Sequence, residues 1–165
     1  MDTCFYLICP TDCLEYTINK TFKSGNYFYT SLANSFNYDR KTLEYIRTMI
    51  KKHTIKEIYF VLSIDNKIVL DAIRTKEFSN IKALHNFYND IRKVKNRTKI
   101  SFKKGDNQFT ILSFYLNKKI KELELELTNL MKQPIKIRGK IYDRNQDVFM
   151  NILPDLVCLE KYHLN

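Results

Sequence analysis

The stretch from Glu57 to Lys67 passes from an apolar, strand-like run directly into a polar segment typical of a helix start. Its first part, Glu57–Ser63, is rich in apolar, aromatic and β-branched residues, and Asp65 and Asn66 follow it at once. In α/β proteins such a junction lies at the carboxyl end of a strand, where their chemistry is usually placed. The junction therefore predicts an α/β fold, yet its own residues carry no obvious chemistry.

Further strands are expected on both sides of this junction. Cys4–Cys9, which is closed by Pro10, and Tyr27–Leu32 predict two strands before Glu57–Ser63. Strict alternation of isoleucine with polar residues predicts a strand at 135–143, and residues 147–152 can return as its hairpin partner. This order predicts a central, mostly parallel sheet with flanking helices and a C-terminal hairpin at the sheet edge.

Helical spacing of apolar residues marks the segments between these strands. We expect Asp39, Asp65 and Ser79 to be the N-caps of three helices. Their buried faces are expected to hold Leu43, Ile46, Met49 and Ile50 in the first, Ile68, Val69, Ala72 and Ile73 in the second, and Ile81, Leu84, Phe87 and Ile91 in the third. A basic loop is expected next, and then one long helix at 109–132, where leucine and isoleucine recur every three or four residues.

Length and composition suit one domain that spans residues 1–165. The chain has 165 residues and is 44% hydrophobic, which is enough for one sizeable core and too little for two ordinary ones. Three of the four cysteines lie near the start, and no signal-like apolar core precedes them, so we expect a reduced, cytoplasmic protein. Charges interrupt every apolar run before about 18 residues, so no membrane span is expected.

The positive charge is concentrated in the middle of the chain. Residues 61–120 hold 13 lysines and arginines against 5 acidic residues, within a net charge of +10. The densest run contains no acidic residue and consists of Arg92, Lys93, Lys95, Arg97, Lys99, Lys103 and Lys104. Such a run can bind phosphates, as in nucleic acid, or an acidic protein, although a solvated basic loop is the simpler interpretation.

Four segments, in order along the chain, resemble motifs of the β-carbonic anhydrase family. Gly25–Ser35 resembles the family's Gly-Asp-x-Phe-x-x-Arg-Asn-Ala-Gly-Asn segment in a weakened form, and Thr42–Tyr45 is similar to its Ser-Leu/Ile-Glu-Tyr helix start. Ile55–Ile58 is similar to its Val-Lys-x-Ile segment, and Ile135–Asp143 to its Leu-Lys-Ile-His-Gly-Trp-Val-Tyr-Asp strand. The resemblance covers most of the chain and implies a β-carbonic anhydrase-like fold and a homodimer.

The family's zinc ligands do not carry over with the fold. The family binds zinc through Cys-x-Asp-Ser/Ala-Arg after the first strand and through His-x-x-Cys after the third. Here Cys9 stands at the first place, Asp12 comes one position late and no arginine follows, while Ser63 and Asn66 replace the second pair. Catalytic zinc needs three ligands of thiolate, imidazole or carboxylate type, so neither a zinc cofactor nor zinc-dependent catalysis is expected.

Two classes of function remain. The first is a non-catalytic, zinc-free relative that acts as a binding, regulatory or interaction module, through the basic region to nucleic acid or an acidic partner. The second is a residual or altered enzyme, for carbon dioxide hydration or related lyase chemistry, with Cys9 and Asp12 as weak catalytic candidates. Either could use a pocket for a small anion or metabolite lined by Cys9, Asp12, Ser31, Asn34, Ser63, Asp65 and Asn66. Capping and turn roles explain Asp65 and Asn34 equally well.

Overall fold

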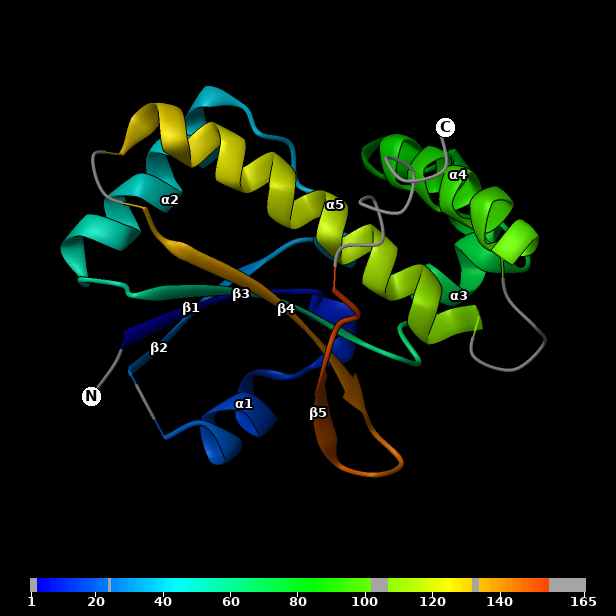
Figure 1. Ribbon diagram of the computed structural model, residues 1–165, viewed down its shortest axis with the longest axis horizontal. Helices are drawn as coiled ribbons and strands as arrows, with labels where there is room; N and C mark the ends of the chain where they lie inside the picture. The colour runs from blue at the N-terminus through cyan, green and yellow to red at the C-terminus, as the bar shows by residue number, and fades with distance from the viewer. Residues whose placement is uncertain (1–2, 24, 102–106, 132–133, 155–165) are drawn as a thin grey trace, which may run out of the picture.

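The computed structural model describes residues 3–23, 25–101, 107–131 and 134–154, and it contains one five-stranded sheet (Figure 1). Its strands are β1 Thr3–Ile8, β2 Gly25–Thr30, β3 Glu57–Ser63, β4 Lys136–Asp143 and β5 Val148–Asn151. In the sheet they take the order β2-β1-β3-β4-β5. The first four run parallel and β5 returns antiparallel to β4, which confirms the predicted α/β fold with a hairpin at one edge.

Helices cover both faces of the sheet. The short helix α1, Glu15–Thr21, lies below the sheet in Figure 1, and α2, Arg40–Lys52, and α5, Asn107–Leu130, lie above it. Helices α3, Lys67–Ile73, and α4, His85–Ser101, lie together beside the first half of α5. Short 3-10 turns at 10–12, 32–34, 77–80 and 82–84 complete the connections. Because both faces are covered, the central strands are buried along almost their whole length.

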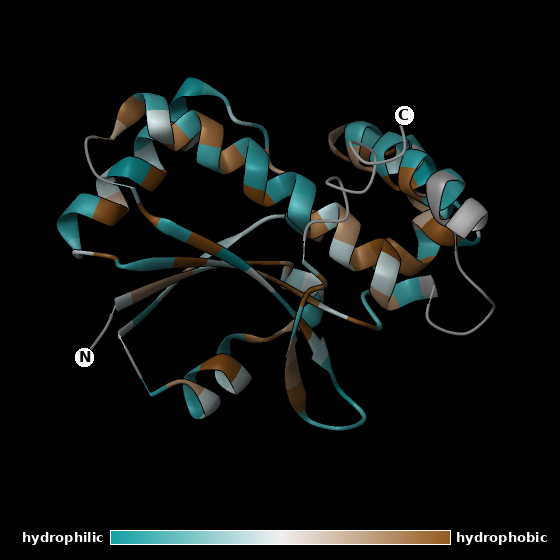
Figure 2. Cartoon of the chain, in the orientation of Figure 1, coloured by the Kyte–Doolittle hydropathy of each residue, from teal (hydrophilic) through white to brown (hydrophobic). Residues whose placement is uncertain are grey.

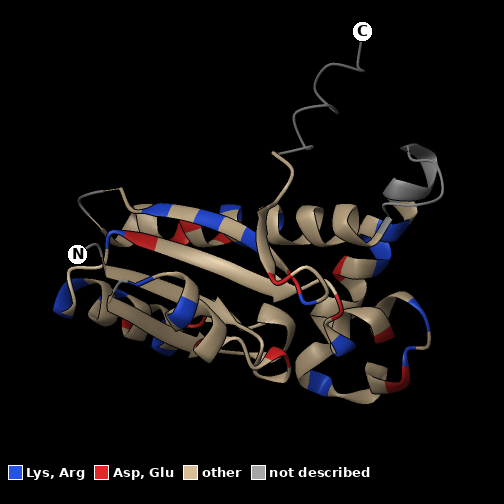
Figure 3. Ribbon diagram, turned by 90° about the horizontal axis from the view of Figure 1, so that it is seen from below, with Lys and Arg blue, Asp and Glu red and all other residues tan. Residues whose placement is uncertain are grey.

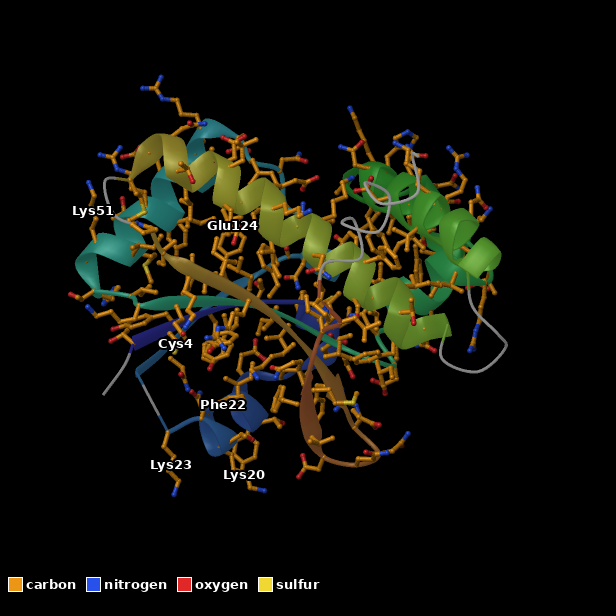
Figure 4. All side chains as sticks on the ribbon, viewed as in Figure 1. Cys4, Lys20, Phe22, Lys23, Lys51 and Glu124 are labelled. Atoms are coloured by element: carbon orange, nitrogen blue, oxygen red, sulfur yellow. The ribbon has the colours of Figure 1, made fainter. Side chains whose placement is uncertain are left out.

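Two hydrophobic clusters, one on each face, make up the core. The larger one contains Phe5, Leu7 and Cys9 on the side of α2 and α5, and the smaller one contains Cys4 and Tyr6 on the side of α1. Cys4 and Cys9 therefore face opposite sides of the sheet, as their spacing predicts. Figure 2 shows hydrophobic residues alternating with hydrophilic ones along α2 and α5, and Figure 4 shows Phe22 below the sheet near Cys4.

The first predicted helix has the expected start. Asp39 Oδ1 accepts a hydrogen bond from the backbone N–H of Thr42 at 2.8 Å, and the helix buries Leu43, Ile46 and Ile50. The capping oxygen satisfies one of the donors that a helix start leaves unpaired. The predicted cap and helix are confirmed, although Met49 is only partly buried.

The segment between α3 and α4 corrects two predictions. Ser79 lies inside a 3-10 turn rather than at a cap, α4 begins at His85, and Ile81 is 41% exposed. The buried carboxylate of Asp71 explains the turn, because it accepts hydrogen bonds from the backbone N–H groups of Glu77 at 2.8 Å and Phe78 at 3.1 Å. These bonds hold the chain in a tight loop where a helix was expected.

The predicted basic loop is also wrong for its first part, because α4 continues through Arg92 to Ser101. Lysine and arginine are good helix formers, and the buried side chains of Ile91 and Val94 extend the helical spacing into the basic run. Residues 102–106, which include Lys103 and Lys104, lie outside the described residues.

No helix among the described residues is both long enough and apolar enough to cross a membrane.

Candidate functional site

The sheet topology creates one crevice, at the carboxyl ends of β1 and β3. The chain leaves β1 toward β2 on one side and leaves β3 toward β4 on the other, so the connections diverge between these two neighbours. In open α/β sheets, ligands bind in the crevice at such a switch point. The loop after β1 and the Ser63–Asn66 segment after β3 meet here, and we call this place the β1–β3 junction.

Asp12 is the centre of the junction. It ends the 3-10 turn that follows β1 and is only 2% exposed. Its Oδ2 accepts a hydrogen bond from the backbone N–H of Ser63, and its Oδ1 accepts one from Asn66 Nδ2, both at 2.8 Å. The register after Cys9 therefore turns Asp12 into the crevice, although it stands one position later than the family's aspartate.

Asn66 joins this carboxylate to helix α3. Its Oδ1 accepts hydrogen bonds from the backbone N–H groups of Ile68 at 3.1 Å and Val69 at 3.0 Å, while its Nδ2 donates to Asp12. Asn66 is thus the N-cap of α3, and the prediction that Asp65 caps this helix is wrong. An amide can accept toward the helix and donate toward a carboxylate at once, which an ionised carboxylate such as Asp65 cannot, and this explains why asparagine suits this position.

Asp65 instead faces an arginine that sequence reasoning missed. The hydroxyl of Ser63 donates to the Asp65 carboxylate, and Arg144 Nε lies 3.3 Å from Asp65 Oδ2. The Arg144 Nη2 group also donates to the carbonyl oxygen of Asp12 at 2.9 Å. The β3–β4 register pairs Ser63 with Tyr142, so the turn after β4 brings a guanidinium group to a crevice that lacks one in the loop after β1.

The two carboxylates of the junction have opposite pKa shifts. Burial raises the pKa of Asp12 to about 6, and it outweighs the hydrogen bonds from Ser63 and Asn66 that lower it. Burial also acts to raise the pKa of Asp65, but the hydrogen bond from Ser63 and the charge of Arg144 lower it overall. Asp12 is therefore the group of the junction that changes charge near neutral pH.

Cys9, Ser31 and Asn34 form a separate part of the predicted pocket. The Cys9 sulfur accepts a hydrogen bond from the backbone N–H of Ala33 at 3.1 Å and lies 3.0 Å from the Thr11 hydroxyl. Asn34 Nδ2 donates to the carbonyl of Val61, while Asn34 Oδ1 and Ser31 Oγ are buried and have no hydrogen-bond partner within the described parts of the chain. The hydrogen-bond partners of the Cys9 thiol among the described residues are an amide and a hydroxyl. Neither can act as a general base that activates the thiol.

The opening above the junction is a hollow of about 260 Å³. It is lined by Thr11, Asp12, Cys13, Asp65, Lys67 and Arg144. The predicted pocket residues Cys9, Ser31, Asn34, Ser63 and Asn66 do not line it. The structure thus brings Asp12, Ser63, Asp65 and Asn66 together and places Ser31 and Asn34 beside Cys9.

The residues at the three expected ligand positions do not fit a zinc ion. Cys9 offers one sulfur, Ser63 uses its hydroxyl toward Asp65, and Asn66 uses both ends of its amide. Zinc takes thiolate, imidazole or carboxylate ligands, and neither a hydroxyl nor an amide is among them. Among the described residues, no group of three or more histidine, cysteine, aspartate or glutamate side chains could hold a metal ion.

The basic run lies partly on α4. Arg92 and Lys93 are exposed there, whereas Lys95 Nζ donates to the carbonyl oxygen of Ile73 at 2.5 Å, at the end of α3. Only the backbone of Arg97 and Lys99 is described, so their side chains lie outside the described part of the chain. Figure 3 shows basic and acidic residues interspersed over the ribbon.

The fold and the site therefore define a class of protein. It has an open α/β sheet, and the polar crevice at its switch point lacks suitable zinc ligands among the described residues. No protein-family model and no curated protein matches the sequence. Solved structures do match. A variant of the β-carbonic anhydrase CafD of Aspergillus fumigatus has a TM-score of 0.73 at 13% identity and covers 93% of this chain and 90% of its own. CafA of the same fungus has a TM-score of 0.70 at 14% identity, with coverages of 97% and 80%.

A third match agrees with these two. The structures of two tetrameric β-carbonic anhydrases of Sordaria macrospora give a TM-score of 0.71 at 13% identity and cover 92% of this chain and 80% of theirs. The chain has the β-carbonic anhydrase fold, as the four sequence segments predict.

Proposed function

We propose that this protein is a non-catalytic, zinc-free protein with the β-carbonic anhydrase fold that acts as a binding or regulatory module. The observation that carries the proposal is the double use of Asn66, which caps α3 with one end of its amide and binds Asp12 with the other. Asn66 stands where the family has a zinc ligand, but its amide oxygen already accepts two hydrogen bonds and has no lone pair left for a metal. Hydration of carbon dioxide at neutral pH needs a metal-lowered water pKa, which this donor set does not support.

Metal content and hydration activity of the purified protein test this proposal. We expect substoichiometric zinc by inductively coupled plasma mass spectrometry and no hydration above the buffer rate in stopped flow. The matched variant Ser63→His/Asn66→Cys restores ligand types at both places and is expected to bind more zinc than the parent chain. One zinc per parent chain, with hydration that a chelator removes, would overturn the proposal.

For the partner we infer a homodimer that binds nucleic acid or an acidic protein through the basic surface of α4. The tetrameric state of the Sordaria macrospora proteins supports self-association. The exposed side chains of Arg92 and Lys93 support contacts with phosphates or carboxylates. Among the described residues, Cys9 and Cys13 are free thiols, and these suit a reducing cytoplasmic setting.

Light scattering after size exclusion tests the dimer, and a monomer at high concentration would contradict it. For nucleic acid, we expect binding of a short RNA to fall steeply between about 50 and 200 mM salt. The double variant Arg92→Gln/Lys93→Gln should weaken it, whereas Lys20→Gln and Lys23→Gln, which lie near α1 on the opposite side (Figure 4), should not. No RNA binding at low salt would leave the acidic protein as the partner class.

One observation favours the second class of function, a residual enzyme. Asp12 has a pKa of about 6, lies at the base of the hollow and is close to Arg144, which suits a general acid or base. Activity in this pocket should survive chelation, follow a pH dependence near 6 and disappear in Asp12→Asn. Carbon dioxide hydration with these three properties would replace the non-catalytic proposal.

A further inference from the structure

A second cavity, of about 390 Å³, lies between the loop after β2 and helices α4 and α5. Its lining includes Phe36, Tyr38, Phe87, Tyr115 and Lys119, and none of its described lining residues also lines the hollow at the β1–β3 junction. We propose that this cavity binds a small organic anion, a phosphorylated polyol such as a sugar phosphate, with the ammonium group of Lys119 as the anchor of the phosphate. The site is independent of whether the junction binds zinc.

Lys119 is unusual because its ammonium group is inside the protein and is only partly satisfied by the residues that the structure describes. The residue is 6% exposed, and its Nζ lies 3.1 Å from Glu122 Oε2, 4.5 Å from the ring centre of Tyr38 and 5.3 Å from that of Phe36. Of its three N–H donors, one serves Glu122, and the aromatic faces attract the charge without accepting ordinary hydrogen bonds. Burial lowers the pKa of Lys119 despite the Glu122 charge, so a second anion would stabilise the ammonium form.

The charges around the cavity favour an anionic ligand. Three lysines, Lys93, Lys118 and Lys119, line it together with two carboxylates, Asp90 and Glu122. Lys118 pairs with Asp90 and lies 3.6 Å from Glu122, so one ammonium charge exceeds the carboxylates. A neutral or cationic ligand would leave this excess uncompensated, whereas a phosphate monoester, with a charge of about −1.5 to −2 at pH 7, compensates it in full.

The remaining lining groups suit hydroxyl groups rather than a bare anion. Ser35 and the amides of Asn37, Asn86 and Asn89 lie around the cavity, and amides can both donate to and accept from a hydroxyl. Phe36, Phe87 and Tyr115 offer apolar surface below them, as in many small-molecule sites of this size. Inorganic phosphate would fill only the part next to Lys119.

The walls of this cavity are held in place by the protein itself. The Tyr38 hydroxyl donates to the carbonyl of Lys119 at 3.0 Å and so fixes the loop after β2 to α5. The Tyr115 hydroxyl donates to the carbonyl of Ala33 at 2.8 Å and joins the same two elements below the cavity. A preformed cavity lowers the cost of ordering when a ligand binds.

Isothermal titration of the full chain with glucose 6-phosphate tests the proposal, with glucose and inorganic phosphate as comparison probes. We expect glucose 6-phosphate to bind more tightly than phosphate, and glucose not to bind. Lys119→Met keeps an unbranched apolar stem and removes the ammonium group, and it should weaken the binding of glucose 6-phosphate about tenfold or more, because a charge-assisted hydrogen bond is lost. Lys51→Met, on α2 at the other end of the molecule (Figure 4), should leave the affinity unchanged.

Asn86→Ala, at the exposed rim, provides a second variant that does not touch the core. It should weaken glucose 6-phosphate and leave the affinity for phosphate unchanged, because only the hydroxyl contacts are removed. The proposal is overturned if glucose 6-phosphate fails to bind at millimolar concentration. It is also overturned if Lys119→Met or Asn86→Ala binds it as well as the parent chain does.

Discussion

The β1–β3 junction and the cavity beside α4 and α5 differ in how far their buried polar groups are hydrogen-bonded. At the junction, Asp12 and Asn66 satisfy each other, and both also bind backbone N–H groups. In the cavity, the ammonium of Lys119 has one carboxylate partner among the described residues, and Lys119 lines the empty volume. Buried groups that complete each other stabilise a fold, whereas a buried charge with unused donors costs stability unless a ligand completes it. We therefore expect substitutions at the junction to change stability most, and substitutions in the cavity to change binding.

The largest effect is expected for Asn66→Asp. The new carboxylate can still cap α3, but it places an oxygen where Nδ2 now donates to Asp12 Oδ1 at 2.8 Å. Two adjacent carboxylates cannot both ionise without a large penalty, so the free energy of unfolding should fall by about 3 kcal/mol or more at pH 7. Urea unfolding followed by circular dichroism measures this loss.

The double variant Asp12→Asn/Asn66→Asp provides the control, because it reverses donor and acceptor. The amide at position 12 can donate to the carboxylate at position 66 and still accept from the Ser63 N–H group. We expect most of the lost stability to return. A double variant as unstable as the sum of both single changes would show that the two side chains do not act as a pair.

A pH series is expected to give the next largest effect. Burial raises the pKa of Asp12 from its ordinary 3.8 to about 6, so between these values the folded state binds more protons than the unfolded state. The stability that Asp12 contributes is fully present below pH 3.8 and is lost as the pH rises through 6. The loss is about 3 kcal/mol, at about 1.36 kcal/mol per unit of pKa difference. Unfolding free energies between pH 4 and 7 should show this decline in the parent chain and a flatter curve in Asp12→Asn. Equal curves would contradict the raised pKa.

A smaller effect is expected for Arg144→Ala. The guanidinium group joins the Asp12 carbonyl and the Asp65 carboxylate, but its side chain is 48% exposed, so water screens the pair. The loss of stability should be about 1 kcal/mol or less. Arg47→Ala, which removes a surface ion pair within α2, is the matched control and should have almost no effect. A loss of several kcal/mol for Arg144→Ala would mean that the turn after β4 belongs to the core of the junction.

The smallest effect on stability is expected for Lys119→Met in the absence of ligand. The change removes a desolvated ammonium group and leaves Glu122 with a 35% exposed side chain that water can reach. Loss of the ion pair destabilises the fold, and relief of the burial cost stabilises it. The free energy of unfolding from thermal melting should therefore differ from that of the parent chain by less than about 1 kcal/mol. A large loss would indicate that Lys119 supports the fold, and it would weaken the contrast between the two regions.

Local sequence patterns were sufficient to predict the strands but not to predict every helix cap. Glu57–Ser63 matches the observed β3 at both ends because a long apolar run that is bounded by polar residues has few alternatives. Asp65 and Asn66 are both good capping residues by type, so the sequence alone could not choose between them. The choice was made by Asp12 across the crevice, which needs a donor, and only Asn66 can supply one.

The prediction for the α4 region was wrong, and the role of Arg144 was missed, for a related reason. The basic run from Arg92 has no acidic neighbours and resembles a solvated loop, but the packing of Ile91 and Val94 and the contact of Lys95 with the end of α3 make it a helix. Arg144 stands in a hairpin turn far along the chain from Asp12. Its place at the crevice depends on the β3–β4 register, which local sequence does not reveal.

The sequence by itself determined the five strands, helices α2, α3 and α5, the likeness to the β-carbonic anhydrase family and the unsuitable ligand types at Ser63 and Asn66, because these follow from local periodicity and residue chemistry. The short helix α1 and the start of α4 were not predicted. Tertiary structure alone decided that Asp12 turns inward, that Arg144 joins it, and that Lys119 rather than its neighbour Lys118 is buried beside a cavity. These features depend on which segments meet across the sheet and between helices. Burial then sets how strongly each charge is felt.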